Sequence, residues 1–246
     1  MNIALIGYGK MGKTIEALGM NQGHHFPLII DEENPGDFNA GNLKNIDVAI
    51  EFTAPGAAPQ NIIKCIDQGV PVVSGTTGWN DRLNEIETYC RKKNGTLFYA
   101  SNFSIGVNIL FAMNRKLARI MNRFPAYQVT MEETHHIHKL DAPSGTAISL
   151  AEQIISETDH LGRWELSGSE EEADGSNNTT DSLKIEAIRE GEVKGIHQVK
   201  YESDVDYISL DHHAKSRDAF AAGVLLAVQF IDNKKGVLGM NDLLKL

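Results

Sequence analysis

The first hundred residues alternate short apolar runs with amphipathic segments, and this alternation constrains the fold more than any other feature of the chain. Each run is rich in β-branched or aromatic residues and ends at a polar or glycine-containing turn. The runs read "IALI", "PLII", "VAIEF", "PVVS" and "LFYA". Helical patterns lie between most of them, so we expect a parallel sheet with right-handed crossovers. The sequence therefore predicts an α/β domain with a Rossmann-type parallel sheet.

A glycine motif, "GYGKMG", follows the first run directly and opens a helix. Gly7 permits a tight turn, Gly9 lets a pyrophosphate approach the backbone, and Gly12 lets helix and strand pack closely. The amino terminus of the helix supplies free N–H groups for the phosphates. We therefore predict that a dinucleotide binds along this motif, in contact with Gly7, Tyr8, Gly9, Lys10, Met11 and Gly12.

Acidic residues follow the second predicted strand. Asp31 stands where an acid binds the hydroxyl groups of the adenosine ribose in such folds. Glu32 and Glu33 come next, with no arginine beside them, and a 2′-phosphate would meet these carboxylates. We therefore predict that NADH is preferred. NADPH stays possible, because Lys10 or Lys13 could reach a phosphate.

Polar turns also follow two later strands, in "SGTTGW" and "SNFSIG". In open α/β sheets, ligands bind at the carboxyl ends of the strands. We expect the nicotinamide end of the cofactor to contact Gly75, Thr76, Thr77, Asn102 and Phe103. Ordinary turn chemistry would explain each of these residues equally well when it is taken alone.

The pattern changes after residue 103 and indicates a second domain. A long helix is predicted over 106–124, a strand over 126–132, a helix over 147–157 and three strands over 182–213, which suggest an α+β domain with a mostly antiparallel sheet. The acidic segment 165–182 is poor in apolar residues and is predicted to be a mobile loop. An apolar helix over 219–232 is expected to pack on the first domain. We thus assign 1–103 and 217–246 to dinucleotide binding, and 104–216 to substrate binding and oligomerisation.

Charge and apolar content exclude several classes of function. The net charge of −10 disfavours nucleic acid and acidic membranes as partners, because both require a basic surface. No window approaches the roughly 18 apolar residues of a membrane span, and the amino terminus lacks a signal-peptide pattern. We therefore expect a cytoplasmic protein. Cys65 and Cys90 lie in helical patterns and are interpreted as small core residues.

The stretch "EETHHIHKLDAPSGTA", over 132–147, is the densest cluster of cationic side chains. Zinc sites usually have other spacings than the H-x₂-H pair of His135 and His138, and Lys139 would repel a cation, so we predict no metal. An anion site fits better. The N–H groups and hydroxyls of Ser144, Gly145 and Thr146 are expected to converge at a helix start, and a histidine nearby can donate a proton at neutral pH.

Six segments together resemble the dihydrodipicolinate reductase family. They are "GYGKMG", "EFTAP", "GTTG", "SNFSIGVN", "HHIHKLDAPSGTA" and "IREGEVKGIH", in this order and across most of the chain. The histidine block is highly specific to that family, whereas GxGxxG is not. The resemblance implies NAD(P)H-dependent reduction of 4-hydroxy-tetrahydrodipicolinate, or of the dihydrodipicolinate that it forms on losing water, to tetrahydrodipicolinate in diaminopimelate and lysine biosynthesis. It also implies a homotetramer.

The resemblance assigns roles to individual residues. His135 matches the family's proton donor, and Lys139 its second acid and its partner for a substrate carboxylate. His136 matches a substrate contact, while Gly145 and Thr146 match the cradle of the other carboxylate. His138 and Asp141 are expected to orient their neighbours, with hydrogen-bonded loop residues as an equal alternative. Ala100 and Ser101 are expected to contact the cofactor mainly through the backbone. Arg217 matches a basic position, where a structural ion pair is an equal alternative.

Two other functions remain as alternatives. The first is a non-catalytic nucleotide sensor, whose second domain would serve only for oligomerisation or partner binding. Such a domain has no need of the polar, cationic "DAPSGTA" turn. Another small-acid or semialdehyde dehydrogenase of similar build would lack the histidine block.

Overall fold

The structure is a computed structural model that describes residues 1–167, 181–216 and 218–246. The chain divides into two compact units, one made of Met1–Ile105 and Asp218–Leu246 and the other of Gly106–Arg217. The boundaries between the units in the sequence thus lie after Ile105 and before Asp218. The predicted boundaries lay after residue 103 and before residue 217. No helix among the described residues is long and apolar enough to cross a membrane.

The first unit contains a six-stranded sheet in the order β11-β5-β4-β3-β1-β2, in which every neighbouring pair is parallel. Its strands are β1 (Asn2–Ile6), β2 (His25–Ile30), β3 (Val48–Glu51), β4 (Val72–Ser74), β5 (Thr96–Tyr99) and β11 (Gly236–Leu238). The five predicted strands and the Rossmann-type sheet are confirmed. The sixth strand, β11, was not predicted, because three half-buried residues give no periodic signal.

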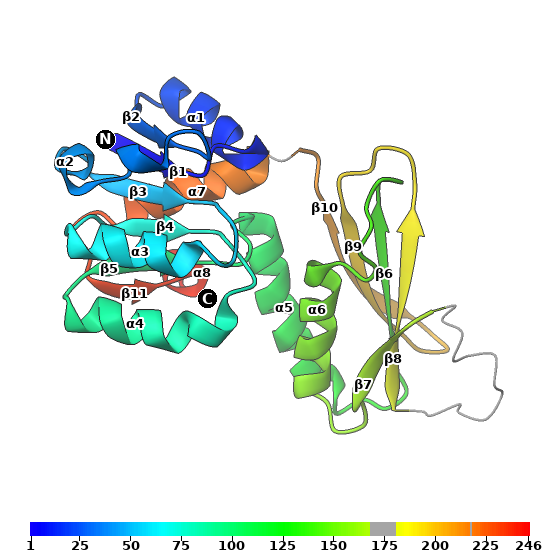
Figure 1. The fold of residues 1–246 in the computed structure, drawn as a ribbon. Coiled ribbons are helices and arrows are strands. Elements are labelled where there is room, and N and C mark those ends of the chain that lie inside the picture. The colour runs from blue at the N-terminus through cyan, green and yellow to red at the C-terminus, as the bar shows by residue number, and fades with distance from the viewer. Residues whose placement is uncertain (168–180, 217) are drawn as a thin grey trace. The chain divides into compact units, whose positions relative to one another are not determined.

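Helices cover both faces of this sheet (Figure 1). They are α1 (Lys10–Asn21), α2 (Ala40–Leu43), α3 (Ala58–Asp67), α4 (Leu83–Lys92), α7 (Asp218–Phe230) and α8 (Met240–Leu244), with short 3₁₀ turns η1 (Pro35–Asp37) and η2 (Asn80–Arg82). One core joins alternate strand residues to α3 and α4, and contains the buried Cys65 and Cys90 as predicted. The other core joins the remaining strand residues to α1, α7 and α8. Burial on both faces explains why the strands read as continuous apolar runs.

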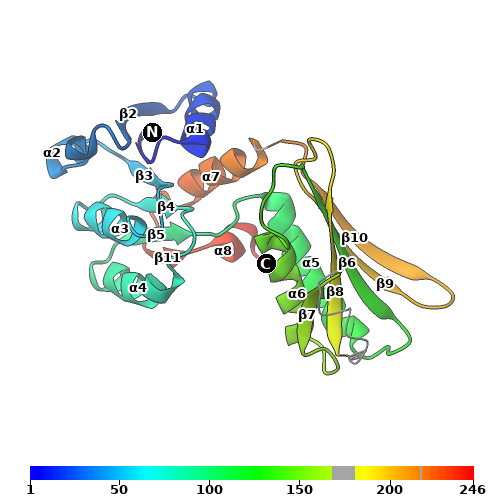
Figure 2. The ribbon, with the colours of Figure 1, turned by 45° about the vertical axis from the view of Figure 1, so that its right-hand side comes forward.

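The second unit contains a five-stranded sheet in the order β10-β9-β6-β8-β7. Its strands are β6 (Gln128–His135), β7 (Arg163–Leu166), β8 (Ser182–Arg189), β9 (Ile196–Glu202) and β10 (Tyr207–His213). The pairs β10–β9 and β9–β6 are antiparallel, whereas β6–β8 and β8–β7 are parallel. Figure 2 shows α5 (Ile105–Met121) and α6 (Gly145–Ser156) on one face of this sheet, where they form its core. The α+β class is confirmed, with a mixed sheet.

Two details of the second unit differ from the sequence analysis. The predicted loop 165–182 is wrong at both ends, since Glu165 lies in β7 and Ser182 begins β8; the rest of it, 168–180, lies outside the described residues. Salt bridges from Arg163 and Lys184 to Glu165 allow this polar segment to form an edge strand. Strand β6 continues to His135, three residues beyond the predicted strand.

Candidate active site

A pocket of about 340 Å³ lies at the carboxyl edge of the parallel sheet, where the chain leaves β1, β3 and β4. The order of strands reverses between β1 and β3, and ligands bind at such switch points in open α/β sheets. Seven of the predicted cofactor residues line the pocket, together with three residues that were not predicted. The predicted seven are Gly9, Lys10, Met11, Gly12, Gly75, Thr76 and Thr77, and the others are Phe52, Thr53 and Pro55.

The three glycines of the motif differ in the space around them, and only Gly9 has open space on its side-chain side. A Cβ at Gly7, whose φ is +98°, would lie 1.9 Å from the Phe52 carbonyl oxygen. A Cβ at Gly12 would lie 2.5 Å from the Gly7 carbonyl oxygen. At Gly9, by contrast, no atom lies within 4 Å of an added Cβ. Gly7 and Gly12 thus allow tight packing, while Gly9 presents open backbone to the pocket, as a pyrophosphate requires.

The remaining predicted cofactor residues lie beside or behind the pocket lining. The Gly7 amide donates to the carbonyl of Ile30 at 2.9 Å, which places Asp31 next to the glycine turn. The Phe103 ring is buried against Phe52, at a centroid distance of 5.9 Å, and therefore supports the pocket from behind. Tyr8 donates a short hydrogen bond to Glu16. Among these residues, Ser101 is exposed, Ala100 is buried, and Asn102 is partly buried after the end of β5.

A buried carboxylate that the sequence analysis missed joins two loops of this pocket. Glu51, at the end of β3, is 0% exposed. Ser74 Oγ donates to it at 2.6 Å, Thr76 Oγ1 donates at 3.0 Å, and the hydroxyl of Thr53 makes a third contact. The Thr53 amide in turn donates to Thr76 Oγ1 at 2.8 Å. Glu51 therefore fixes the loop after β3 to the loop after β4.

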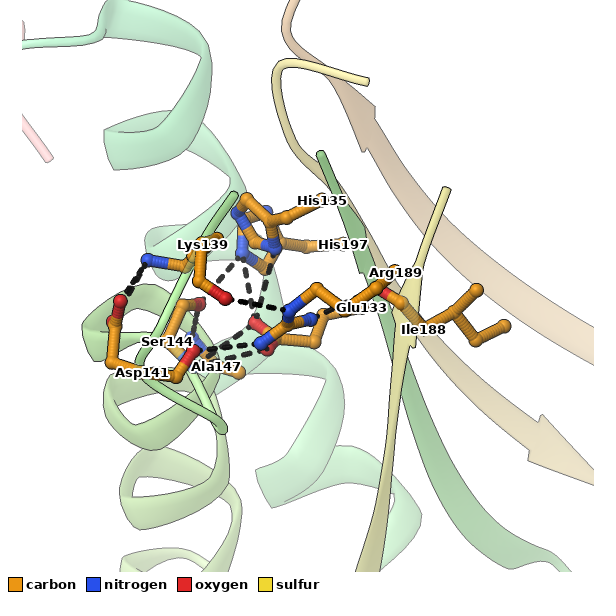
Figure 3. Close-up of polar contacts among 9 residues, drawn as sticks. All are labelled: Glu133, His135, Lys139, Asp141, Ser144, Ala147, Ile188, Arg189 and His197. Atoms are coloured by element: carbon orange, nitrogen blue, oxygen red, sulfur yellow. Dashed lines mark hydrogen bonds and ion pairs between the residues drawn. The ribbon is translucent and has the colours of Figure 1, made fainter. Parts of the chain in front are cut away.

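The histidine stretch begins inside the sheet of the second unit. Because side chains alternate along a strand, Glu133 and His135 at the end of β6 point to the same face. Across the sheet, Glu133 is paired with His197 of β9, and His135 with Arg189 of β8. Directly paired residues share a face, so four ionisable side chains from three strands gather at one end of the sheet (Figure 3).

These side chains lie close together and largely out of solvent. Glu133 Oε2 is 3.6 Å from His135 Nδ1 and 3.7 Å from His197 Nε2. Burial lowers the pKa of His135, and the Glu133 carboxylate opposes this effect. Burial also lowers the pKa of His197 to about 3, with the neighbouring His135 contributing. Burial thus disfavours protonation of both rings, and His135 is the histidine of this pair whose protonation is favoured by the Glu133 carboxylate.

The segment between β6 and α6 is fastened by Arg189, which the sequence analysis did not single out. Its guanidinium donates to the carbonyl of Asp141 at 2.7 Å and to that of Lys139 at 3.3 Å. Lys139 Nζ contacts both carboxylate oxygens of Asp141 at 2.8 Å, and this contact lowers the pKa of Asp141. The lysine is thus held near the site, but an anion that bound there would share it with Asp141.

The start of α6 forms only part of the predicted anion cradle. Ser144 is its N-cap, and the Ser144 hydroxyl accepts from the Ala147 amide at 3.2 Å and contacts His197 Nε2 at 3.1 Å. The prediction that the Ser144 amide is free for a ligand is wrong, because it donates to both Glu133 oxygens, at 3.0 and 3.1 Å. Gly145 is exposed and Thr146 half-buried, and their amides have no acceptor among the described residues. Two amides therefore remain for an anion.

The other histidines of the stretch lie further out. His136 follows β6 and is half-buried, and its ring lies 6.1 Å from that of His138. The His138 side chain is 71% exposed and lies 3.5 Å from Glu192. Arg217, the basic position noted in the sequence, lies outside the described residues.

One group of side chains within the described part of the chain has the geometry of a metal site. Ligand atoms of Glu133, His135 and His197 lie within 4.8 Å of one another. Both Glu133 oxygens, however, already accept from the Ser144 amide, and Arg189 lies 3.6 Å from one of them. The Arg189 guanidinium and the Ser144 amide thus already compensate the negative charge of Glu133. The group is better suited to moving a proton than to holding a cation.

A dinucleotide-type pocket in one unit and a buried acid–base cluster beside an anion site in the other define a class, the two-domain nicotinamide-dependent oxidoreductases. The comparisons with known proteins narrow this class. The family described as "Dihydrodipicolinate reductase" matches over residues 1–103 with its N-terminal part and over residues 106–244 with its C-terminal part. The chain belongs to the dihydrodipicolinate reductase family.

Individual relatives agree with this assignment. The chain is 44% identical to the 4-hydroxy-tetrahydrodipicolinate reductase of Christiangramia forsetii over 99% of its length and 98% of the relative. It is 33% identical to that of Neisseria meningitidis, covering 94% of this chain and 84% of the relative. Among solved structures, the dipicolinate-bound dihydrodipicolinate reductase from Paenisporosarcina sp. TG-14 has the same fold, with a TM-score of 0.77 at 23% identity and 98% coverage of both chains.

Proposed function

We propose that the protein catalyses the NAD(P)H-dependent reduction of 4-hydroxy-tetrahydrodipicolinate, or of the dihydrodipicolinate formed from it by loss of water, to tetrahydrodipicolinate. One observation carries the proposal within the second unit. The buried His135 and the open amides at the start of α6 are linked through a single carboxylate, Glu133. A proton donor and an anion site are thus built into one cluster, as the reduction of a cyclic dicarboxylate requires.

Each part of the cluster has a role in the proposed reaction. The amides of Gly145 and Thr146, with the Thr146 hydroxyl, bind one carboxylate of the substrate. Lys139 and His136 bind the other carboxylate. A reduced nicotinamide, when bound, would supply a hydride to the substrate ring. His135 then protonates the adjacent ring carbon, and neutral imidazole remains.

The cofactor contacts follow from the first unit. The open backbone at Gly9 and the start of α1 bind the pyrophosphate, and the loop of Gly75, Thr76 and Thr77 faces the nicotinamide end. Asp31, beside the glycine turn, accepts from the ribose hydroxyls. We propose that NADH is preferred over NADPH, because a 2′-phosphate would lie near Asp31 and the acidic residues that follow it.

The decisive experiment is an assay with NADH and NADPH in parallel. The substrate is generated fresh by condensing pyruvate with aspartate semialdehyde, and nucleotide oxidation is followed by absorbance. We expect oxidation that requires the substrate, with the larger kcat/KM for NADH. If neither nucleotide is oxidised, calorimetry with NADH and with pyridine-2,6-dicarboxylate decides the alternative, because a nucleotide sensor would bind the first and not the second.

A Lys139→Ala variant tests the carboxylate contact. We expect KM for the substrate to rise about 10- to 100-fold, because a charge-assisted contact is lost. The charge of Asp141 would also lose its partner and repel the dicarboxylate. Lys116→Ala, at an exposed position of α5, is the matched control and should leave KM unchanged. An unaltered KM in Lys139→Ala would show that the lysine serves only to hold Asp141.

The resemblance implies a homotetramer, and the sequence pattern predicts a cytoplasmic protein; both statements stay predictions. Light scattering of the purified protein measures the oligomeric state directly.

A further inference from the structure

Glu133 is a buried charge to which the roles above assign no task in the reaction. It is 0% exposed, and it lies two positions before His135 on the same face of β6. A buried carboxylate is costly unless it is paired and hydrogen-bonded. Its surroundings therefore indicate what its charge is for.

Four groups from four elements converge on this carboxylate, as Figure 3 shows. The Ser144 amide, at the start of α6, donates to both oxygens at 3.0 and 3.1 Å. The guanidinium of Arg189 on β8 lies 3.6 Å from Oε1. His135 Nδ1 on β6 and His197 Nε2 on β9 lie 3.6 and 3.7 Å from Oε2. Glu133 thus touches the proposed proton donor and the N-cap of the helix that is proposed to bind substrate.

The two nitrogens of His135 have different surroundings. Nδ1 is buried, has no hydrogen-bond partner among the described residues, and has the Glu133 carboxylate as its nearby charge. Nε2 faces Gly195, where an added Cβ would lie only 3.1 Å away. The absence of a side chain at Gly195 therefore leaves space at Nε2. A proton on Nδ1 would be held toward Glu133, while the proton on Nε2 can be transferred.

We propose that Glu133 is a positioning residue for the proposed reaction: it directs Nδ1 of His135 inward, favours the protonated imidazole, and fixes the start of α6 beside it. This inference rests on the proposed role of His135 as proton donor. In this proposal one carboxylate has two tasks. It stabilises the positive charge of protonated His135, and it holds His135 at a fixed distance from the anion site at the start of α6.

The charges that face His135 make the proposal specific. Lys139, in the segment after β6, and Arg189 on β8 disfavour its protonation, whereas Asp141 in that segment and Glu133 on its own strand favour it. His197 on β9, and His212 on β10 beyond it, are both shifted toward the neutral form by burial. Asp141 is 62% exposed and paired with Lys139, so its charge is screened and compensated. Glu133 is therefore the carboxylate whose buried charge acts most strongly on His135.

A Glu133→Gln variant removes this charge and keeps an oxygen for the Ser144 amide. A general acid must be protonated, so activity falls as pH rises through its pKa. Without the Glu133 charge the pKa of His135 falls, and the decline in kcat should move to lower pH by about one to two units. At a pH above both midpoints, kcat should drop about 10- to 100-fold; at acidic pH it should return to within about threefold of the wild type.

The matched control is Glu132→Gln, which makes the same change one residue earlier, on the opposite face of β6. Its pH profile should overlay that of the wild type. A loss in Glu133→Gln that is equal at all pH values, or an unshifted profile, would overturn the proposal in favour of a purely structural role. If Glu133→Gln does not fold, Arg189→Gln replaces it: removal of the competing cation should move the decline in kcat to higher pH, and an unmoved or lowered midpoint overturns the proposal.

Titration of the histidine ring signals by NMR separates this proposal from the proposed function. The His135 signal is assigned by its loss in a His135→Gln variant, and its midpoint is measured without substrate. A midpoint lowered by Glu133→Gln, but not by Glu132→Gln, supports the inference even if the enzyme assay fails. An unchanged midpoint overturns the inference and leaves the proposed function intact.

Discussion

A His135→Gln variant is expected to keep its fold and its affinity for the cofactor, but to lose about 10²- to 10⁴-fold in kcat, the usual contribution of a positioned general acid. Glutamine is close to histidine in size and polar, so the packing against His197, whose ring lies 5.2 Å from that of His135, is disturbed little. It has no proton to transfer near neutral pH. Steady-state kinetics with saturating NADH measure the effect.

A second histidine provides the control for this prediction. His160→Gln makes the same chemical change at an exposed position after α6 and should leave kcat within about twofold of the wild type. If His135→Gln retains most of its kcat at every pH, another group donates the proton. Lys139 would be the next candidate, since it is the second acid implied by the family resemblance.

A Gly7→Ala variant is expected to lower the free energy of unfolding by about 3 kcal/mol or more and to abolish binding of the cofactor. The added Cβ would lie 1.9 Å from the Phe52 carbonyl oxygen, and the φ of +98° is strained for alanine. Relief of the overlap requires β1 and the loop after β3 to separate, and these segments line the pocket. Urea denaturation measures the loss of stability, and NADH fluorescence measures binding.

Gly9→Ala separates the two effects. Its Cβ would meet no atom within 4 Å, and Gly9 has an extended backbone conformation that alanine accepts. We expect a change in stability below about 1 kcal/mol, together with much weaker NADH binding, because the methyl group occupies the side from which the pyrophosphate approaches. Equal stability of Gly7→Ala and Gly9→Ala would contradict this account of the glycine turn.

The first unit could be predicted largely from sequence, because its signals are local. Strands such as Val48–Glu51 are buried on both faces and therefore read as short apolar runs between turns. The six-residue glycine motif marks the turn between the first strand and the first helix, and this turn lies at the switch point of the sheet. The weak elements, β11 and β7, have three and four residues with no fully buried position among them, so no periodicity marks them.

The candidate active site was only partly predictable, because its contacts connect distant strands. The histidine block and the helix that follows it can be recognised in the sequence. The sequence pattern does not indicate that β6 lies between β8 and β9, which brings Arg189 and His197 to the histidine block. The use of the Ser144 amide by Glu133 was missed for the same reason, since the carboxylate lies on the preceding strand.

The Glu51 network has a consequence for how a ligand binds in the pocket of the first unit. The hydroxyl of Ser74 at the end of β4 and those of Thr53 and Thr76 on two loops contact one buried carboxylate, so these loops lose conformational freedom as the chain folds. A ligand that enters such a preorganised pocket does not have to order the loops again. Association with the cofactor should then show a heat-capacity change set by the surface that the ligand itself covers, with no contribution from coupled folding of these loops.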